Sequence, residues 1–168
     1  MAVIRRQSIH RENQTLPQEE RDNISRQMFM AIINMLRGYR RSFNALERAI
    51  LDELQRAIPE HVRQAFAQRL ISINMVQPIL GGHEINLYER RNGKILFGSE
   101  GRVVSTDASI LIATVELHSA DEMSCLTASL FCGNGVLTSL EFNRPSEHAD
   151  IEKVSAMSVS ITPETPWT

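Results

Sequence analysis

The chain has 168 residues, of which 42% are hydrophobic and 23% are charged, and its formal net charge is −2. This composition is typical of a globular protein and excludes the intrinsically disordered class, and a chain of this length fits one domain. No apolar run is long enough to cross a bilayer and no secretion signal is recognisable, so we expect a cytoplasmic protein.

The small net charge conceals an uneven distribution along the chain. Residues 1–75 carry 12 Arg and no Lys against 8 acidic residues, a formal charge of +4. Residues 76–168 carry 6 basic residues against 12 acidic ones, a formal charge of −6. Such polarity can reflect a charged partner surface, and more often it reflects solvated faces of the protein.

The N-terminal region is predicted to contain a lead-in and a first helix. Residues 1–17 are basic and lack periodicity, so we expect them to be flexible and place the domain at 18–168. Apolar residues then recur every three or four positions, which predicts a helix over 18–37. Its methionine-rich face, which includes Met28 and Met35, suits contact with the rest of the protein or with a second subunit in a homodimer.

Two further helices are predicted over residues 45–57 and 59–73. Asn44 followed by Glu47 resembles a capping box, and Pro59 suits the first position of a new helix. The apolar stripes of the two helices are Leu46, Ile50 and Leu54, and Val62, Phe66, Leu70 and Ile73.

After Pro78 the hydrophobic period changes from about 3.6 to two, which predicts strands. The pairs Asn92-Gly93 and Asn134-Gly135 each lie between apolar or alternating runs, and Asn-Gly is the strongest short signal for a two-residue hairpin turn. The first hairpin is expected to pair Arg91 with Lys94, Glu89 with Leu96 and Tyr88 with Phe97. The second is expected to pair Leu137 with Cys132, Leu140 with Ser129 and Phe142 with Thr127.

The remaining segments complete a predicted sheet over residues 79–161. The apolar run 110–113 predicts a strand buried on both faces, and weak alternation over 154–161 predicts an edge strand. The fold class is therefore α+β, with two or three N-terminal helices packed on one face of a five- or six-stranded, mainly antiparallel meander.

No motif in the chain indicates catalysis, a metal or a cofactor. The five histidines are dispersed, and no HxxxH, HExxH or Cys-x-x-Cys spacing is present. Cys125 and Cys132 are seven residues apart on one predicted strand, so their side chains point to opposite faces and an intrastrand disulfide is disfavoured. We expect a protein that is not an enzyme, with no metal ligands and no cofactor.

Two charged clusters remain as candidate binding surfaces. Arg37, Arg40 and Arg41 suit phosphate, but the pI of about 6.2 argues against a nucleic-acid partner. The acidic cluster in the last elements suits a basic protein such as a nuclease toxin. Its members, our candidate partner-binding residues, are Glu116, Asp121, Glu122, Glu141, Glu147, Asp150 and Glu152.

Residues 134–145 read Asn-Gly-Val-Leu-Thr-Ser-Leu-Glu-Phe-Asn-Arg-Pro. Along the whole chain, the predicted helices come first and the predicted strands follow. In this the chain resembles the small bacterial immunity-type proteins of polymorphic toxin systems, in which a late hairpin of the form turn-Gly-x-Leu-x-x-Leu-Glu-aromatic precedes a polar loop. The resemblance implies an immunity protein that neutralises a toxin by direct contact, and it implies no catalytic residues.

Two other functions are compatible with the same pattern. A curved sheet packed on helices often encloses a small-molecule pocket, with Tyr88, His83 or His118 near its mouth. Alternatively, the chain is a structural protein that dimerises through the helix 18–37.

Overall fold

The computed structural model describes residues 38–96, 101–119 and 125–168, which lie within the compact unit Arg37–Thr168. The predicted lead-in 1–17 and helix 18–37 lie outside the described residues. In chain order the elements are α2 (Ala45–Ala57), α3 (Glu60–Ser72), β1 (Met75–Ile79), the 3₁₀ turn η1 (Leu80–Gly82), β2 (Glu84–Arg91), β3 (Lys94–Leu96), β4 (Ile110–Ser119), β5 (Leu126–Gly133), β6 (Val136–Phe142), the 3₁₀ turns η2 (Ser146–His148) and η3 (Ile151–Lys153), and β7 (Val154–Ile161).

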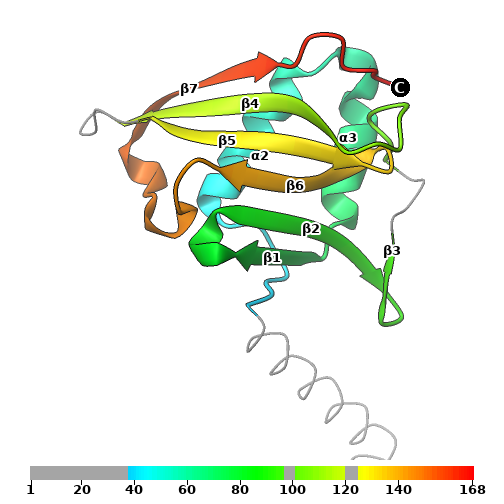
Figure 1. Cartoon of the computed structure of the whole chain (residues 1–168), viewed down its shortest axis with the longest axis horizontal. Coiled ribbons are helices and arrows are strands. Elements are labelled where there is room, and N and C mark those ends of the chain that lie inside the picture. Colours follow the sequence, from blue (N-terminus) through cyan, green and yellow to red (C-terminus); the bar gives the residue numbers. More distant parts are fainter. Residues whose placement is uncertain (1–37, 97–100, 120–124) are drawn as a thin grey trace, which may run out of the picture. The chain divides into compact units, whose positions relative to one another are not determined.

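The strands form one antiparallel sheet in the order β1-β2-β6-β5-β4-β7, with β3 paired to β2 (Figure 1). Both helices lie on the same face of this sheet, which confirms the predicted α+β class. The sheet has seven strands instead of the expected five or six. No described helix has the length and apolar character that a membrane span requires.

The sheet is a simple meander only from β4 to β6. β3 is three residues long and pairs with the end of β2, so residues 84–86 at the start of β2 remain available and pair with β6. β7 then returns to the free edge of β4. The strand order therefore differs from the predicted meander, because β3 is too short to pair along the whole of β2 and leaves its first residues to β6.

β1 is a strand that the sequence pattern did not reveal, because the predicted sheet began at residue 79. Pro78 lies within β1, opposite Ile85. Proline lacks the N–H that a central strand needs, and it is tolerated here because β1 lies at the edge of the sheet, where the bridge between Val76 and Arg40 does not extend to Pro78.

The two helix starts agree with the sequence pattern. The N–H of Glu47 donates to Oδ1 of Asn44 over 2.8 Å, and the N–H of Asn44 donates to Oε2 of Glu47 over 3.0 Å, which completes the capping box. α3 begins directly after Pro59. The predicted ranges 45–57 and 59–73 are thus confirmed to within one residue.

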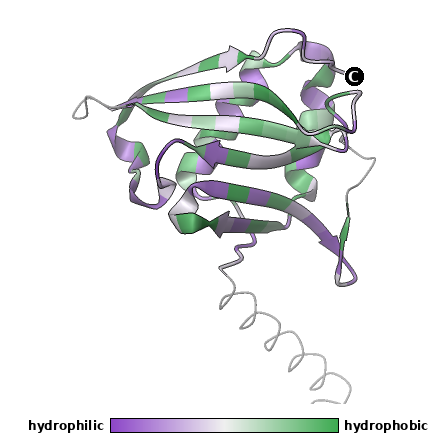
Figure 2. Cartoon of the chain, viewed as in Figure 1, coloured by the Kyte–Doolittle hydropathy of each residue, from purple (hydrophilic) through white to green (hydrophobic). Residues whose placement is uncertain are grey.

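The core lies between the helices and the sheet face that they cover. Ile50, Leu54 and Phe66 on the helices are completely buried, as are Val115 on β4 and Leu130 on β5. Alternate residues of β4 and β5 face this layer, and Figure 2 shows the resulting bands of polar and apolar residues along β4.

At two β-bulges the structure differs from the prediction, in the burial of β4 and in the register of the hairpin at Asn134-Gly135. In β4 the register shifts between Leu111 and Ala113, so Ile112 and Ala113 are both buried while Leu111 is only half-buried. The run is therefore not buried on both faces. An apolar run without alternation can mark a bulge as well as a central strand.

The second bulge lies in the hairpin at Asn134-Gly135. Cys132 pairs with Leu137 as predicted, but Phe131 pairs with Ser139, so Thr138 is the extra residue. Beyond it the predicted register was wrong by one residue: Leu140 pairs with Leu130, and Phe142 pairs with Ala128. The one-residue insertion keeps apolar side chains of both strands on the helix-covered face.

The hairpin at Asn92-Gly93 has the predicted register. Arg91 pairs with Lys94 and Glu89 pairs with Leu96. Asn92 and Gly93 have φ values of 50° and 80°, as a turn with two positive φ angles requires. The predicted pair of Tyr88 with Phe97 cannot be compared, since Phe97 is outside the described residues.

Candidate functional site

Acidic residues gather at one end of the sheet. Because the strands are antiparallel, the ends of β4 and β6 lie at the same edge as the starts of β2, β5 and β7, and η2 and η3 connect strands there (Figure 1). We call this region the acidic end. Its described acidic residues are Glu84, Glu116, Glu141, Glu147, Asp150 and Glu152.

Five of the seven predicted partner-binding residues lie in the acidic end. Glu116 on β4 and Glu141 on β6 are exposed, and so are the three that follow β6. Those three are Glu147, Asp150 and Glu152. Asp121 and Glu122 lie outside the described residues.

The acidic end has little internal charge compensation. Glu84 and Glu141 are direct cross-strand neighbours, and like charges in this position destabilise a sheet. Among the ion pairs of the described residues, only Glu116 takes part, through a 3.8 Å separation between its Oε2 and Nε2 of His118. Arg144 and Lys153 are described basic residues of the same region, so its six described carboxylates leave the acidic end with a formal charge of −4.

The backbone that carries these acidic residues is held in place by hydrogen bonds. The buried Ser146 Oγ donates to the carbonyl of Gly82 over 2.8 Å, which joins η2 to η1. The N–H of Phe142 donates to the carbonyl of His83 over 2.7 Å, and the N–H of Glu152 donates to Oδ1 of Asp150 over 3.0 Å. The acidic side chains therefore extend from an ordered framework.

The opposite end of the sheet, which we call the basic end, carries most of the basic residues of the sheet. Arg90 and Arg91 end β2, and Lys94 begins β3. Arg102 lies beside the Asn134-Gly135 turn, and its Nη1 is 2.9 Å from Oδ1 of Asp107. The sheet is therefore electrically polar along the direction of its strands.

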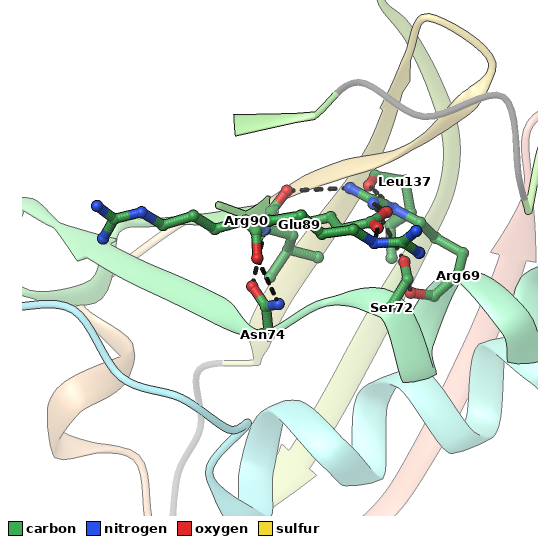
Figure 3. Close-up of polar contacts among 8 residues, drawn as sticks. Arg69, Ser72, Asn74, Glu89, Arg90 and Leu137 are labelled. Carbon is green, nitrogen blue, oxygen red and sulfur yellow. Dashed lines mark hydrogen bonds and ion pairs between the residues drawn. The ribbon is translucent and has the colours of Figure 1, made fainter. Parts of the chain in front are cut away.

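A buried ion pair joins α3 to the sheet near the basic end (Figure 3). Arg69 is only 2% exposed; its Nε donates to the carbonyl of Leu137 over 3.0 Å and its Nη2 to that of Leu87 over 3.1 Å. Its Nη1 is 4.0 Å from Oε2 of buried Glu89, whose Oε1 is 2.6 Å from Nε of Arg91. Burial lowers the pKa of Arg69, while Glu89 opposes this shift. This arrangement satisfies buried groups and indicates a structural role.

A surface groove of about 620 Å³ lies beside this ion pair. Ile71, which is 84% exposed, and Asn74 contribute to its lining. The side chain of Asn74 accepts from the N–H of Arg90 over 2.8 Å and donates to its carbonyl over 2.9 Å, so it extends the pairing of β1 and β2. Asn74, Glu89 and Arg91, which line the groove, are therefore engaged with the protein itself.

The residues predicted at the mouth of a ligand pocket do not converge. His83 precedes β2, and its Nδ1 is 3.2 Å from the carbonyl of Phe142. Tyr88 lies near the other end of β2, opposite Met75, and burial raises its pKa. His118 is on β4, two strands beyond β6.

One described member of the arginine cluster is engaged with the protein itself. Nη2 of Arg40 is 2.6 Å from Oε1 of the fully buried Glu47, so Arg40 is committed to the capping box. Arg41 is exposed, and Arg37 lies outside the described residues.

The two cysteines are both free, as the sequence spacing predicts, and they differ in environment. Cys132 is buried under the helices, and burial raises the pKa of its thiol to about 12. Cys125 precedes β5 and is half-buried. Of the two thiols, only that of Cys125 is accessible.

One group of possible metal ligands is brought together by the fold. Glu116, His118 and Cys125 each offer one ligand atom, and these three atoms all lie within 4.8 Å of one another. The sequence motifs did not predict this group, because Glu116 and His118 lie on β4 whereas Cys125 lies directly before β5. The signal in the sequence was Glu-x-His in a strand, followed by a cysteine at the start of the next strand.

Comparison of the chain with protein-family models, curated proteins and solved structures found no match. The functional argument therefore depends on the acidic end, the buried ion pair and the group of possible ligands described above.

Proposed function

We propose that this protein is a non-enzymatic, cytoplasmic binding protein that neutralises a basic protein partner, as an immunity protein neutralises its toxin. The acidic end is the contact surface. The observation that carries the proposal is the set of exposed carboxylates around η2 and η3 and at the ends of β4 and β6, together with the half-buried Glu84 of β2, which is the cross-strand neighbour of Glu141.

The electrostatic repulsion between Glu84 and Glu141 favours a binding role for this end of the sheet. A like-charge pair on a sheet is unfavourable in the isolated protein, and it becomes favourable when a cationic surface lies against it. The hydrogen bonds of Ser146 and Asp150 hold the carrying segment, so little conformational entropy is lost on binding.

The mechanism is occlusion by charge-complementary contact. A nuclease or another enzyme that acts on an anionic substrate has a basic substrate groove, and the acidic end presents carboxylates to such a groove. The contact would exclude the substrate without any chemical step. Complementary charge also accelerates encounter between the two proteins.

Co-expression of the full-length chain with the product of the adjacent gene tests this proposal. We expect the two proteins to co-purify and the chain to protect the host cell from the toxic product. If the adjacent product neither co-purifies with the chain nor is neutralised by it, the proposed immunity function is wrong.

Charge-neutral variants then locate the surface. The double variant Glu141→Gln/Glu147→Gln should weaken binding by about 2- to 30-fold, the equivalent of two exposed ion pairs. Asp107→Asn/Glu164→Gln removes the same charge at the opposite end of the sheet and should leave the affinity unchanged. Equal losses in both variants would show that net charge, and not the acidic end, governs binding.

A further inference from the structure

We propose that Glu116, His118 and Cys125 form a binding site for a divalent transition metal ion, with Zn²⁺ as the best match. The inference is independent of the proposed partner, since it concerns the purified chain alone. It rests on the geometry of the three side chains, on how their backbone is held, and on the chemistry of the donor atoms.

The pairing of β4 with β5 places the three residues on one face. Glu116 and His118 are two residues apart on β4, so their side chains point to the same side of the sheet. Leu117 pairs with Leu126, which brings His118 beside Cys125 across the ladder. The buried Leu117 faces the helices, so the three possible ligands lie on the uncovered face.

The spacing of the donor atoms is close to that of a metal site. The Zn–N, Zn–O and Zn–S bond lengths of a tetrahedral site imply about 3.3–3.8 Å between neighbouring ligand atoms. Here Nε2 of His118 is 3.8 Å from Oε2 of Glu116, and all three ligand atoms lie within 4.8 Å of one another. A small rotation of exposed side chains is enough to close the set around an ion.

The backbone on both sides of the site is fixed. Ser155 Oγ on β7 donates to the carbonyl of His118 over 3.0 Å. Nδ2 of Asn143 donates to the carbonyl of Cys125 over 3.2 Å, and the N–H of Thr127 donates to Oδ1 of the same Asn143 over 3.0 Å. These hydrogen bonds hold the backbone positions of His118 and Cys125, which is the kind of support that a binding site needs.

The donor set selects the class of metal. Imidazole and thiolate ligands favour Zn²⁺ and related transition metals, whereas Ca²⁺ and Mg²⁺ prefer oxygen alone. The Sγ of Cys125 now donates to the carbonyl of Leu117 over 3.2 Å. Metal binding would break this hydrogen bond and release the thiol proton to solvent, because the ligand is the thiolate. Three protein ligands leave a fourth position for water.

Titration of the reduced, metal-free, full-length protein with Co²⁺ tests the site. We expect one equivalent to bind, with the near-ultraviolet charge-transfer absorption of a cobalt–thiolate bond, and Zn²⁺ to displace it. The chain has only two cysteines, and Cys132 is buried, so a thiolate signal from the folded protein identifies Cys125.

Substitutions complete the test. Cys125→Ser should abolish the charge-transfer band, and His118→Gln should weaken Co²⁺ binding by more than the 10–100-fold that loss of an outer-shell partner typically costs. His148→Gln and Glu141→Gln alter exposed residues of the same acidic end, and both variants should bind Co²⁺ as the wild type does. Thermal unfolding of each variant verifies that it is folded.

Three outcomes would overturn the proposal. These are no stoichiometric Co²⁺ binding, binding without a thiolate band, and binding that the two ligand substitutions leave unchanged. Glu116 belongs to both sites, so the test substitutions are placed at His118 and Cys125, which are not among the proposed contact residues, and the two experiments remain distinguishable.

Discussion

At the scale of single residues, Arg69 is a buried side chain that joins α3 to two strands of the sheet. It is the donor for two backbone carbonyls of different strands and lies beside the buried carboxylate of Glu89. Removal of Arg69 would leave Glu89 paired with Arg91 alone and would take the side-chain donor from the buried carbonyls of Leu87 and Leu137, which costs more than replacement of both members of the ion pair.

We therefore expect Arg69→Met to lower the free energy of unfolding by about 3–5 kcal/mol. In the double variant Arg69→Met/Glu89→Leu, the total loss should be smaller than the sum of the single losses by about 0.5–3 kcal/mol. Urea unfolding monitored by circular dichroism measures all four proteins. Additive losses would show that the two side chains do not stabilise each other.

We expect Cys132 to lower the free energy of unfolding as the pH rises through the alkaline range. Burial raises the pKa of its thiol from 9.0 to about 12. As the pH rises through this interval the unfolded chain loses the thiol proton first, so the unfolded state binds fewer protons than the folded state. The free energy of unfolding should therefore fall with pH, by up to about 1.4 kcal/mol per pH unit from this group.

Cys132→Ala should reduce that slope. Its stability at neutral pH will be lower, because the substitution leaves a small cavity, so the comparison concerns the change with pH and not the absolute value. Chemical unfolding at a series of pH values between neutral and alkaline measures it. Parallel curves for the variant and the wild type would contradict the prediction.

At the scale of elements, the approach of α3 to the segment that begins at Gly101 is set by the absence of a side chain. Gly101 has a φ of 76°, and a Cβ atom there would lie 2.9 Å from the backbone N of Arg69 and 3.0 Å from the carbonyl oxygen of Ala65. Gly93, in the first hairpin, has a similar φ of 80°, but an added Cβ would meet nothing within 4 Å.

This pair of glycines separates two effects of one substitution. Gly93→Ala should cost about 1 kcal/mol of unfolding free energy through backbone strain alone. Gly101→Ala should cost about 1–3 kcal/mol more, because helix backbone must move away from the new methyl group. Thermal and urea unfolding of the two variants test this. Equal losses would mean that α3 yields to the methyl group without cost.

At the scale of the whole molecule, the charge polarity of the sheet would govern how the chain meets the basic partner that we propose. The acidic end and the basic end lie at opposite ends of the strands, so the field orients an approaching cationic protein. Salt screens such steering, since the Debye length falls from about 10 Å at 0.1 M to about 3 Å at 1 M ionic strength.

The association rate constant with the basic partner should therefore fall by at least about tenfold over this range of ionic strength. The dissociation rate should change less. Surface plasmon resonance or stopped-flow mixing at several salt concentrations measures both. An association rate that is independent of salt would argue against recognition through the acidic end.

Much of the fold was predictable because local chemistry dictates it. The capping box of Asn44 and Glu47 and the turn at Asn92-Gly93 each depend on residues close together in the chain. The bulge at Thr138 was not predictable, because it depends on which face of two strands the helices cover. The edge strand β1 escaped notice because Pro78 is acceptable only where one side of a strand is unpaired.

The amino-acid sequence by itself determined the two described helices and the hairpin turns. It also determined the excess of acidic residues in the second half of the chain, from which the candidate contact surface was predicted. Only the tertiary structure decided that β6 pairs with β2 and β7 with β4, that acidic residues from separate elements share one end of the sheet, and that Cys125 lies beside His118. The physical reason is range. Propensities and turns act over a few neighbouring residues, whereas strand pairing joins distant residues through burial of one shared apolar face.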